Sequence, residues 1–201
     1  MDSNEIHELI KNLKWSTSEN LRNDAVKRLT NIEESELHML LQPISKSYWE
    51  NAAIVLKKIG YPRVKSVIPG LLEWIQDINW PGAQHIIEVL ATVDSEAITY
   101  VREVFKSGDG IWIKWLLSEV ISKWSIELIN EIKGDLLNLA NALDYNLIIE
   151  DVDIQSMKLL YESRIMTTEE ISNIIERKKG MYRQLLEGLQ ELSDLVNRSE
   201  N

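Results

Sequence analysis

The chain has 201 residues, of which 44% are hydrophobic and 27% charged, so it can form one domain with a core, with or without an appendage, and is not disordered. It contains no cysteine and three histidines, which excludes disulfides and thiolate sites and argues against a histidine-rich metal site, so we expect neither metal nor cofactor. The net charge is −10, and acidic residues outnumber basic ones in each of the segments 1–45, 46–110, 111–150 and 151–201. Because nucleic-acid binding needs clustered Lys and Arg, we expect no nucleic-acid partner and favour a basic protein or peptide.

The sequence shows no pattern typical of a signal peptide or a membrane span. The opening "MDSNEIHELI" is acidic and lacks the charged-then-apolar order of a signal peptide. No apolar run approaches the roughly 18 residues that a membrane span needs. We therefore expect a cytoplasmic chain with no membrane partner.

Apolar residues recur at steps of three and four along most of the chain, which predicts helices. The clearest stretches are "SENLRNDAVKRLTNI" (18–32), "SYWENAAIVLKKIG" (47–60), "NWPGAQHIIEVLATV" (79–93) and "GIWIKWLLSEVISKW" (110–124). Alternating strand patterns are nearly absent, and Gly and Pro fall mostly between the helical stretches. The pattern predicts an all-α fold.

The helices repeat with a period near 31 residues. One set of apolar residues closes the first helix of each pair at spacings of 30, 31 and 31, and these are Leu29, Ile59, Leu90 and Ile121. A second set lies eight residues further on, at Leu37, Val67, Ile98 and Ile129. Two helices per unit predict a HEAT-like α-solenoid of about four stacked pairs over residues 1–143, because stacking buries the faces that one pair leaves exposed. The alternative is an irregular helical bundle with coincidental spacing.

Two tryptophans flank an expected corner between units. We expect residues 69–76 to form a second helix and residues 80–93 the next first helix, with Asn79 as its N-cap. Trp74, Trp80 and Pro81 would then be structural, with the rings filling the gap between stacked pairs. A ligand or partner site is the alternative.

The same stretch carries a resemblance. "PGLLEWIQDINWPGAQ", followed by "YVREVF" and "GIWIKWLLSEVI", resembles a family of short bacterial HEAT-like domains of unknown function over about residues 10–130. The resemblance implies a HEAT-like helical fold and no catalytic residues.

Residues 144–201 are expected to form a C-terminal helical extension or cap. We expect residues 144–153 to be extended, residues 154–165 to be helical, and a last helix to begin at Thr167 or Thr168 with Glu170 completing a capping box. Its apolar seam comprises Tyr182, Leu185, Leu189, Leu192 and Val196. Lys178 interrupts this seam and Gly180 is a potential break. The helix either caps the last pair or mediates self-association through residues 168–198.

No catalytic motif is recognisable, and "SGDG" (107–110) is explained by a turn between helices. If second helices line a concave face, an acidic set with one aromatic residue would project near it: Glu73, Asp77, Tyr100, Glu103, Glu127 and Glu131. Such a face suits a basic peptide or protein.

Two functions follow. The first is a non-catalytic protein-binding module, such as an adaptor, an inhibitor or an immunity-type protein. The alternative is a nucleic-acid enzyme similar to the HEAT-like DNA glycosylases, in which Trp112, Trp115 and Asp109 would imitate the tryptophans and carboxylate that hold a damaged nucleotide. Those enzymes need a basic concave surface, and this acidic sequence argues against one.

Overall fold

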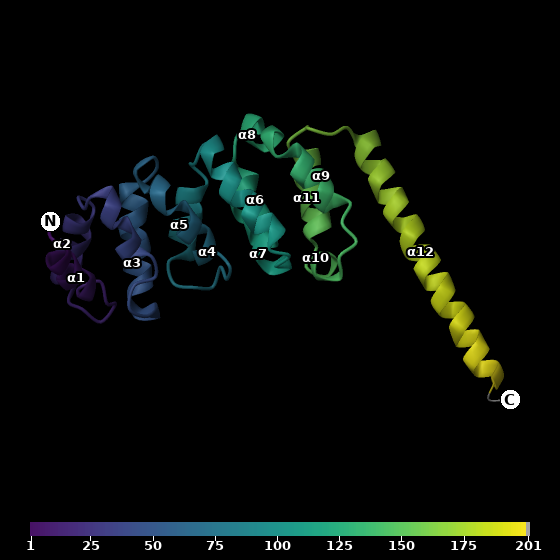
Figure 1. The fold of residues 1–201 in the computed structure, drawn as a ribbon, viewed down its shortest axis with the longest axis horizontal. Coiled ribbons are helices and arrows are strands. Elements are labelled where there is room, and N and C mark those ends of the chain that lie inside the picture. Colours follow the sequence, from purple (N-terminus) through teal and green to yellow (C-terminus); the bar gives the residue numbers. More distant parts are fainter. Residues whose placement is uncertain (200–201) are drawn as a thin grey trace.

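A computed structural model describes residues 1–199, and it is helical with no strand among those residues. The helices follow one another in a row, and the last one projects away from the rest (Figure 1). The α-helices are α1 (Ser3–Lys11), α2 (Glu19–Leu29), α3 (Lys46–Ile59), α4 (Ile68–Trp74), α5 (Ala83–Leu90), α6 (Ile98–Lys106), α7 (Gly110–Trp115), α8 (Ile126–Glu131), α9 (Lys133–Ala140), α10 (Tyr145–Ile149), α11 (Val152–Glu162) and α12 (Thr168–Ser199). Short turns of other helix types are η1 (Glu34–Leu40), η2 (Arg63–Val67), η3 (Ser95–Ala97), the π-helical η4 (Leu116–Val120) and η5 (Ile121–Lys123).

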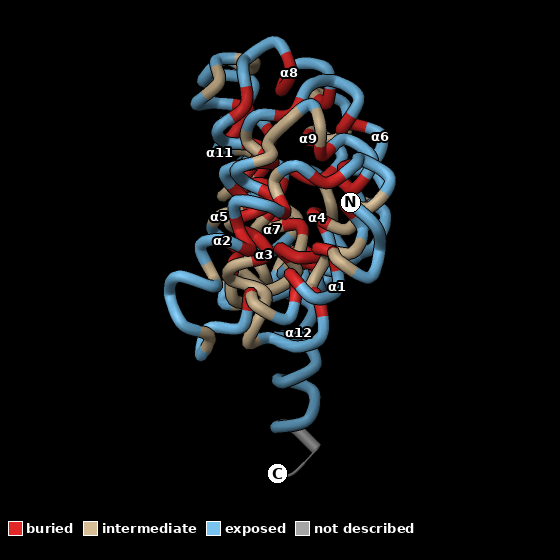
Figure 2. Tube along the Cα trace, turned by 90° about the vertical axis from the view of Figure 1, so that its left-hand side faces the viewer, coloured by how far each residue is buried: buried red, intermediate tan, exposed pale blue. Residues whose placement is uncertain are grey.

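Packing runs between neighbours along this row. Helix α2 contacts α3, α3 contacts α5, α4 contacts α5 and α6, and α9 contacts α11. The buried residues form one core, and a view along the row shows them inside, with exposed residues around them (Figure 2). In the described part of the chain, no helix is long and apolar enough to cross a membrane.

The predicted core positions are largely confirmed. Seven of the eight periodic residues are buried, namely Leu29, Leu37, Val67, Leu90, Ile98, Ile121 and Ile129. Ile59 is only partly buried, because it is the last residue of α3. The second element of the first pair is the 3-10 helix η1 rather than an α-helix.

The predicted start of the helix at residue 80 is wrong. Helix α5 begins at Ala83 and its N-cap is Gly82, with φ of 85°. Asn79 lies in the preceding turn, where its backbone N–H donates to Asp77 Oδ1 at 2.8 Å. The reason is a close approach to α3, since a Cβ on Gly82 would lie 2.5 Å from the Cβ of Ala53.

The extended segment predicted for residues 144–153 is also wrong. Residues Tyr145–Ile149 form α10, and the Asp144 carboxylate caps it by accepting from the backbone N–H of Asn146 at 2.9 Å. Helix α11 covers most of the predicted helix at 154–165. The packing of α9 against α11 crosses the boundary placed after residue 143.

The capping box at the start of α12 is confirmed. Glu170 Oε2 accepts from the backbone N–H of Thr167 at 2.7 Å, and Thr167 Oγ1 accepts from the backbone N–H of Glu170 at 3.2 Å. The potential break at Gly180 does not occur, and α12 runs through it over its full 32 residues. A single glycine costs a helix only about 1 kcal/mol, too little to break one of this length.

Candidate functional site: an acidic-rimmed groove between α4 and α6

Three of the six residues predicted for the acidic face meet in one hollow. Glu73 from α4, with Tyr100 and Glu103 from α6, line a groove of about 190 Å³. The remaining lining residues are Pro69, Leu72, Val104 and Trp112. The hollow therefore combines an apolar lining with two carboxylates and a phenol.

The apolar lining is held in place by contacts between α7 and α4. Trp112 Nε1 donates to the backbone oxygen of Leu72 at 2.9 Å, which ties α7 to the last turn of α4. Asp109 caps α7, since its Oδ1 accepts from the backbone N–H of Trp112 at 3.0 Å. Leu72 and Val104 are buried, so this part of the groove is preformed.

The carboxylates of the groove are exposed. Glu73 is exposed, and Tyr100 keeps 38% of its surface accessible. Glu103 Oε1 lies 2.8 Å from Lys106 Nζ, but both side chains are more than half exposed (65% and 69%), and such pairs contribute little. The groove therefore presents negative charge next to an apolar surface.

The other three predicted residues lie elsewhere. Asp77 holds the turn after α4. Glu127 lies in the first turn of α8, where a hydrogen bond from its own backbone N–H, and then one from Ser125, lower its pKa. Glu131 ends α8, and its backbone oxygen accepts from Arg102 at 3.3 Å. None of the three lines the groove.

The tryptophan corner is a packing cluster. Trp74 is fully buried, and its Nε1 donates to the backbone oxygen of Pro81 at 3.0 Å. Trp49 of α3 meets both corner rings edge-on, with its centroid 6.0 Å from Trp74 and 5.5 Å from Trp80. Lys46 Nζ lies 5.5 Å from the Trp80 ring centroid. Trp74 presents no surface to a ligand, while Trp80 is partly exposed.

The alternative enzyme constellation does not gather in this groove. Trp112 lines it, but neither Asp109 nor Trp115 does, and the Asp109 carboxylate is engaged as a helix cap. Among residues 1–199, no group of three or more His, Asp or Glu residues is placed to hold a metal ion.

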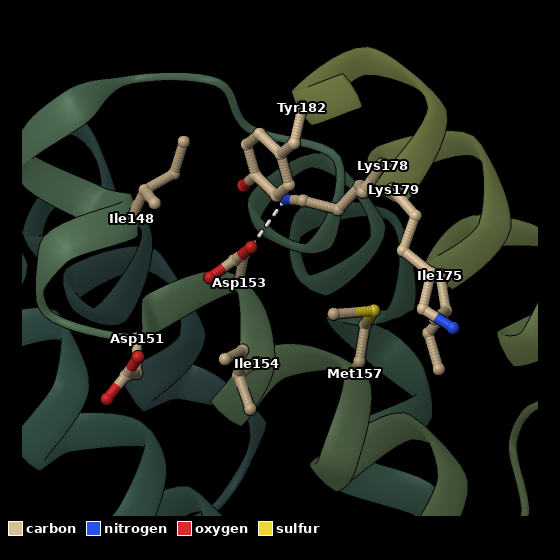
Figure 3. Close-up of a pocket in the computed structure, with 9 residues that line it drawn as sticks. All are labelled: Ile148, Asp151, Asp153, Ile154, Met157, Ile175, Lys178, Lys179 and Tyr182. Carbon is tan, nitrogen blue, oxygen red and sulfur yellow. Dashed lines mark ion pairs between the residues drawn. The ribbon is translucent and has the colours of Figure 1, made fainter. Parts of the chain in front are cut away.

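A second notable cluster, which sequence reasoning missed, joins α12 to the row. Lys178 and Asp153 are both buried, and Lys178 Nζ lies 2.5 Å from Asp153 Oδ2 (Figure 3). The same ammonium donates to the backbone oxygens of Ala140 at 3.1 Å and Ala142 at 3.0 Å. The only signal in the sequence is a lysine at a seam position, where it looks like an interruption of the seam.

The features just described define an all-helical protein with a preformed acidic-rimmed groove. The chain belongs to the family described as a domain of unknown function, DUF5071, whose model matches residues 41–160. This match begins later and ends later than the resemblance seen in the sequence, and it includes α10 and most of α11. No curated protein and no solved structure matches the chain.

Proposed function

We propose that this chain is a HEAT-like α-solenoid that acts as a non-catalytic protein-binding module, and that the groove between α4 and α6 receives a basic side chain of its partner. An adaptor, an inhibitor and an immunity-type protein all fit this description. The lack of a nucleic-acid partner and the cytoplasmic location stay predictions from the composition.

The repeat architecture is supported by polar links at one period. Arg63 donates to the backbone oxygen of Ile32, 31 residues away, and to that of Thr30, 33 residues away. Arg102 Nε donates to Asp135, 33 residues away, and Trp124 Nε1 donates to the backbone oxygen of Leu90, 34 residues away. Links that join residues about one unit length apart, such as these, are typical of stacked units that contact only their neighbours.

The observation that carries the binding proposal is the composition of the groove. A lysine or arginine side chain has an apolar stem and a cationic end, and it prefers to bury the stem while the charge stays near water. Pro69 and the Trp112 indole, which keep accessible surface, offer the apolar contact above the buried Leu72 and Val104. Glu73 and Glu103 offer the counter-charge, and the ring of Tyr100 offers a cation–π contact.

The test is a fluorescence-anisotropy titration with short labelled peptides in which an apolar residue flanks one central arginine. The comparison peptide carries citrulline, which keeps the shape of arginine and removes its charge. We expect saturable binding of the arginine peptide, weakened by salt, and much weaker binding of the citrulline peptide.

Matched variants locate the binding. Glu73→Gln and Glu103→Gln should each weaken the arginine peptide by about two- to fivefold, the range expected for exposed charge pairs. Glu127→Gln is the control, because this glutamate is exposed but lies outside the groove. Equal effects of all three variants, or equal binding of both peptides, would contradict the proposal.

A further inference from the structure

Helix α12 is packed against the other helices at its start and exposed to solvent over the rest of its length. Its first part packs on the row, and Ile171, Ile174 and Lys178 are 8%, 7% and 5% exposed. The helix projects away from the other helices toward its C-terminal end (Figure 1), and residues 182–197 are all exposed. Five leucines on this projecting part are 57–66% exposed, namely Leu185, Leu186, Leu189, Leu192 and Leu195. So much apolar surface on a projecting helix marks an interaction site.

The spacing of the apolar residues specifies a helical partner. Tyr182, Leu185, Leu189 and Leu192 follow alternating steps of three and four, as in a coiled-coil seam. Leu186 and Leu195 widen the face beyond that seam, so a single narrow helix contact would leave part of it exposed. The partner must therefore offer a helix and an adjoining apolar surface.

The chain itself carries such an adjoining surface where α12 leaves the row. A hollow of about 510 Å³ is lined by apolar side chains such as Ile148, Ile154 and Met157, with Tyr182 at its edge (Figure 3). A second hollow of about 340 Å³ on the C-terminal side of Tyr182 is lined by residues including Leu143 and Leu185. Both hollows adjoin the base of the projecting helix.

The charges along α12 fix the direction of pairing. The stretch 177–183 carries Arg177, Lys178, Lys179 and Arg183 and no acidic residue. The stretch 184–197 carries Glu187, Glu191 and Asp194 and no basic residue. Two copies aligned in parallel would place like charges together, whereas an antiparallel pair places each basic stretch beside the acidic stretch of the other copy.

We propose that α12 is a homodimerisation element in which two copies pair antiparallel about a twofold axis. Residues 185–195 of each copy then cover the hollows beside Tyr182 of the other. The heptad register pairs Tyr182 with Leu192 of the second copy, and Leu185 with Leu189 of the second copy. Arg183 then lies level with Glu191 of the second copy. The interface uses the same patch on both copies, as closed twofold symmetry requires.

Self-association is measured by analytical ultracentrifugation or light scattering on the full chain. We expect a dimer for the unmodified chain, and at least about a hundredfold weaker association for the double variant Leu185→Glu/Leu189→Glu, since each pairing would bury carboxylates. The thermal unfolding of the single chain should be unchanged, because both leucines are exposed in it. Leu21→Glu on α2 is the control, since this leucine is 56% exposed and should leave the dimer intact.

The orientation is tested by cysteine crosslinking, which the absence of native cysteine makes unambiguous. A mixture of Tyr182→Cys and Leu192→Cys chains should give the mixed disulfide, and Leu192→Cys alone should give little crosslink. Thermal unfolding of each variant checks that it is folded. Efficient crosslinking of Leu192→Cys with itself would indicate parallel pairing and overturn the proposal.

A charge swap gives an independent test. Glu191→Lys/Asp194→Lys and Lys179→Glu/Arg183→Glu should each weaken self-association, and mixing the two chains should restore a heterodimer. A chain that stays monomeric up to about 100 μM, or charge variants that dimerise as well as the unmodified chain, would overturn the proposal. The arginine-peptide groove lies on α4 and α6, so the two proposals fail or succeed separately.

Discussion

The corner around Trp74 and the joint around Lys178 each fix one helix against the next, by opposite chemistry. At the corner, Trp74 is fully buried against Trp49, and the one polar group of its side chain is hydrogen-bonded to Pro81. At the joint, the Lys178 ammonium is buried with Asp153 and two backbone oxygens. The corner is stabilised by the removal of apolar surface from water. At the joint, the attraction between the two charges must first offset the free-energy cost of desolvating them.

Burial alone therefore does not show how much each of these two junctions contributes to the free energy of unfolding. A buried aromatic ring stabilises the fold roughly in proportion to the apolar area it buries, and removing it leaves a cavity that costs further free energy. A buried ion pair contributes little net free energy, but it is costly to break on one side only. We therefore expect the corner to control the stability of the whole row, and the joint to control where α12 docks.

Removing the Trp74 ring should give the largest effect. Trp74→Ala should lower the free energy of unfolding by about 3–5 kcal/mol, because it loses burial and leaves a cavity. Urea-induced unfolding measures this. Trp15→Ala is the control, since Trp15 is 60% exposed and its loss should stay within about 0.5 kcal/mol. Similar values for the two variants would show that the corner is not a stabilising core.

The second-largest loss of stability should come from adding a methyl group at Gly82, next to the corner. In Gly82→Ala, the new methyl group would meet Ala53, and the backbone would have to keep φ at 85°. Both penalties act together, so we expect a loss of about 2–3 kcal/mol in the free energy of unfolding. Gly108→Ala is the comparison, because this glycine also has positive φ, of 70°, but has nothing near its Cβ position. An equal loss in both variants would mean that the approach to α3 adds no cost.

Breaking the joint should have a smaller and more local effect. Lys178→Met leaves Asp153 buried without its cation, but undocking of α12 limits the penalty to about 1–3 kcal/mol. Hydrogen exchange should rise in residues 168–182 and stay unchanged around the corner. The double variant Lys178→Met/Asp153→Leu should recover most of the loss, since it removes both charges. A double variant as unstable as the single one would show that the ion pair itself stabilises the joint.

A hydrogen bond between the turns that hold Tyr61 and Asp94 should give the smallest effect on stability, and that effect should depend on pH. Tyr61 donates to Asp94, and this bond raises the pKa of Tyr61 to about 12 and lowers the pKa of Asp94. The link should therefore weaken as pH rises from 10 toward 12, and again as pH falls below the usual Asp value of 3.8.

Tyr61→Phe isolates that contribution. It should lower the free energy of unfolding by about 0.5–1.5 kcal/mol near pH 7 and flatten both limbs of its pH dependence. Unfolding curves measured from pH 3 to 11 provide the test. An unchanged acid limb would show that Asp94 does not depend on Tyr61.

Sequence periodicity predicted the core well, because a repeated three-four spacing can be satisfied only by placing one face inside. It could not locate the start of α5, since the need for Gly82 comes from Ala53 on another helix. It also missed the helix at 145–149, whose acidic residue is a cap rather than a break. Local rules placed residues 80–82 in a helix and residues 145–149 in extended chain, and a tertiary contact decided the first while a local cap, Asp144, decided the second.

The sequence predicted which residues of the candidate site carry charge, but not which of them lie together. Carboxylates on second helices were identified, but the sequence could not show that Glu73 and Glu103 share a groove while Glu127 does not. That depends on how far apart consecutive helices lie. The role of Lys178 was hidden for a similar reason, since its acidic partner lies on a different helix and their pairing leaves no pattern in the sequence.

The modest separation of the polar links has a consequence for how the chain folds. Many hydrogen bonds between helices close loops of 31 to 40 residues, wherever in the row they start. The entropic cost of closing a loop grows only with the logarithm of its length, so each of these closures costs nearly the same. No distant segment has to find another before the first contacts form. In the solenoid proposed above, folding could therefore begin between any two neighbouring helices and spread in both directions.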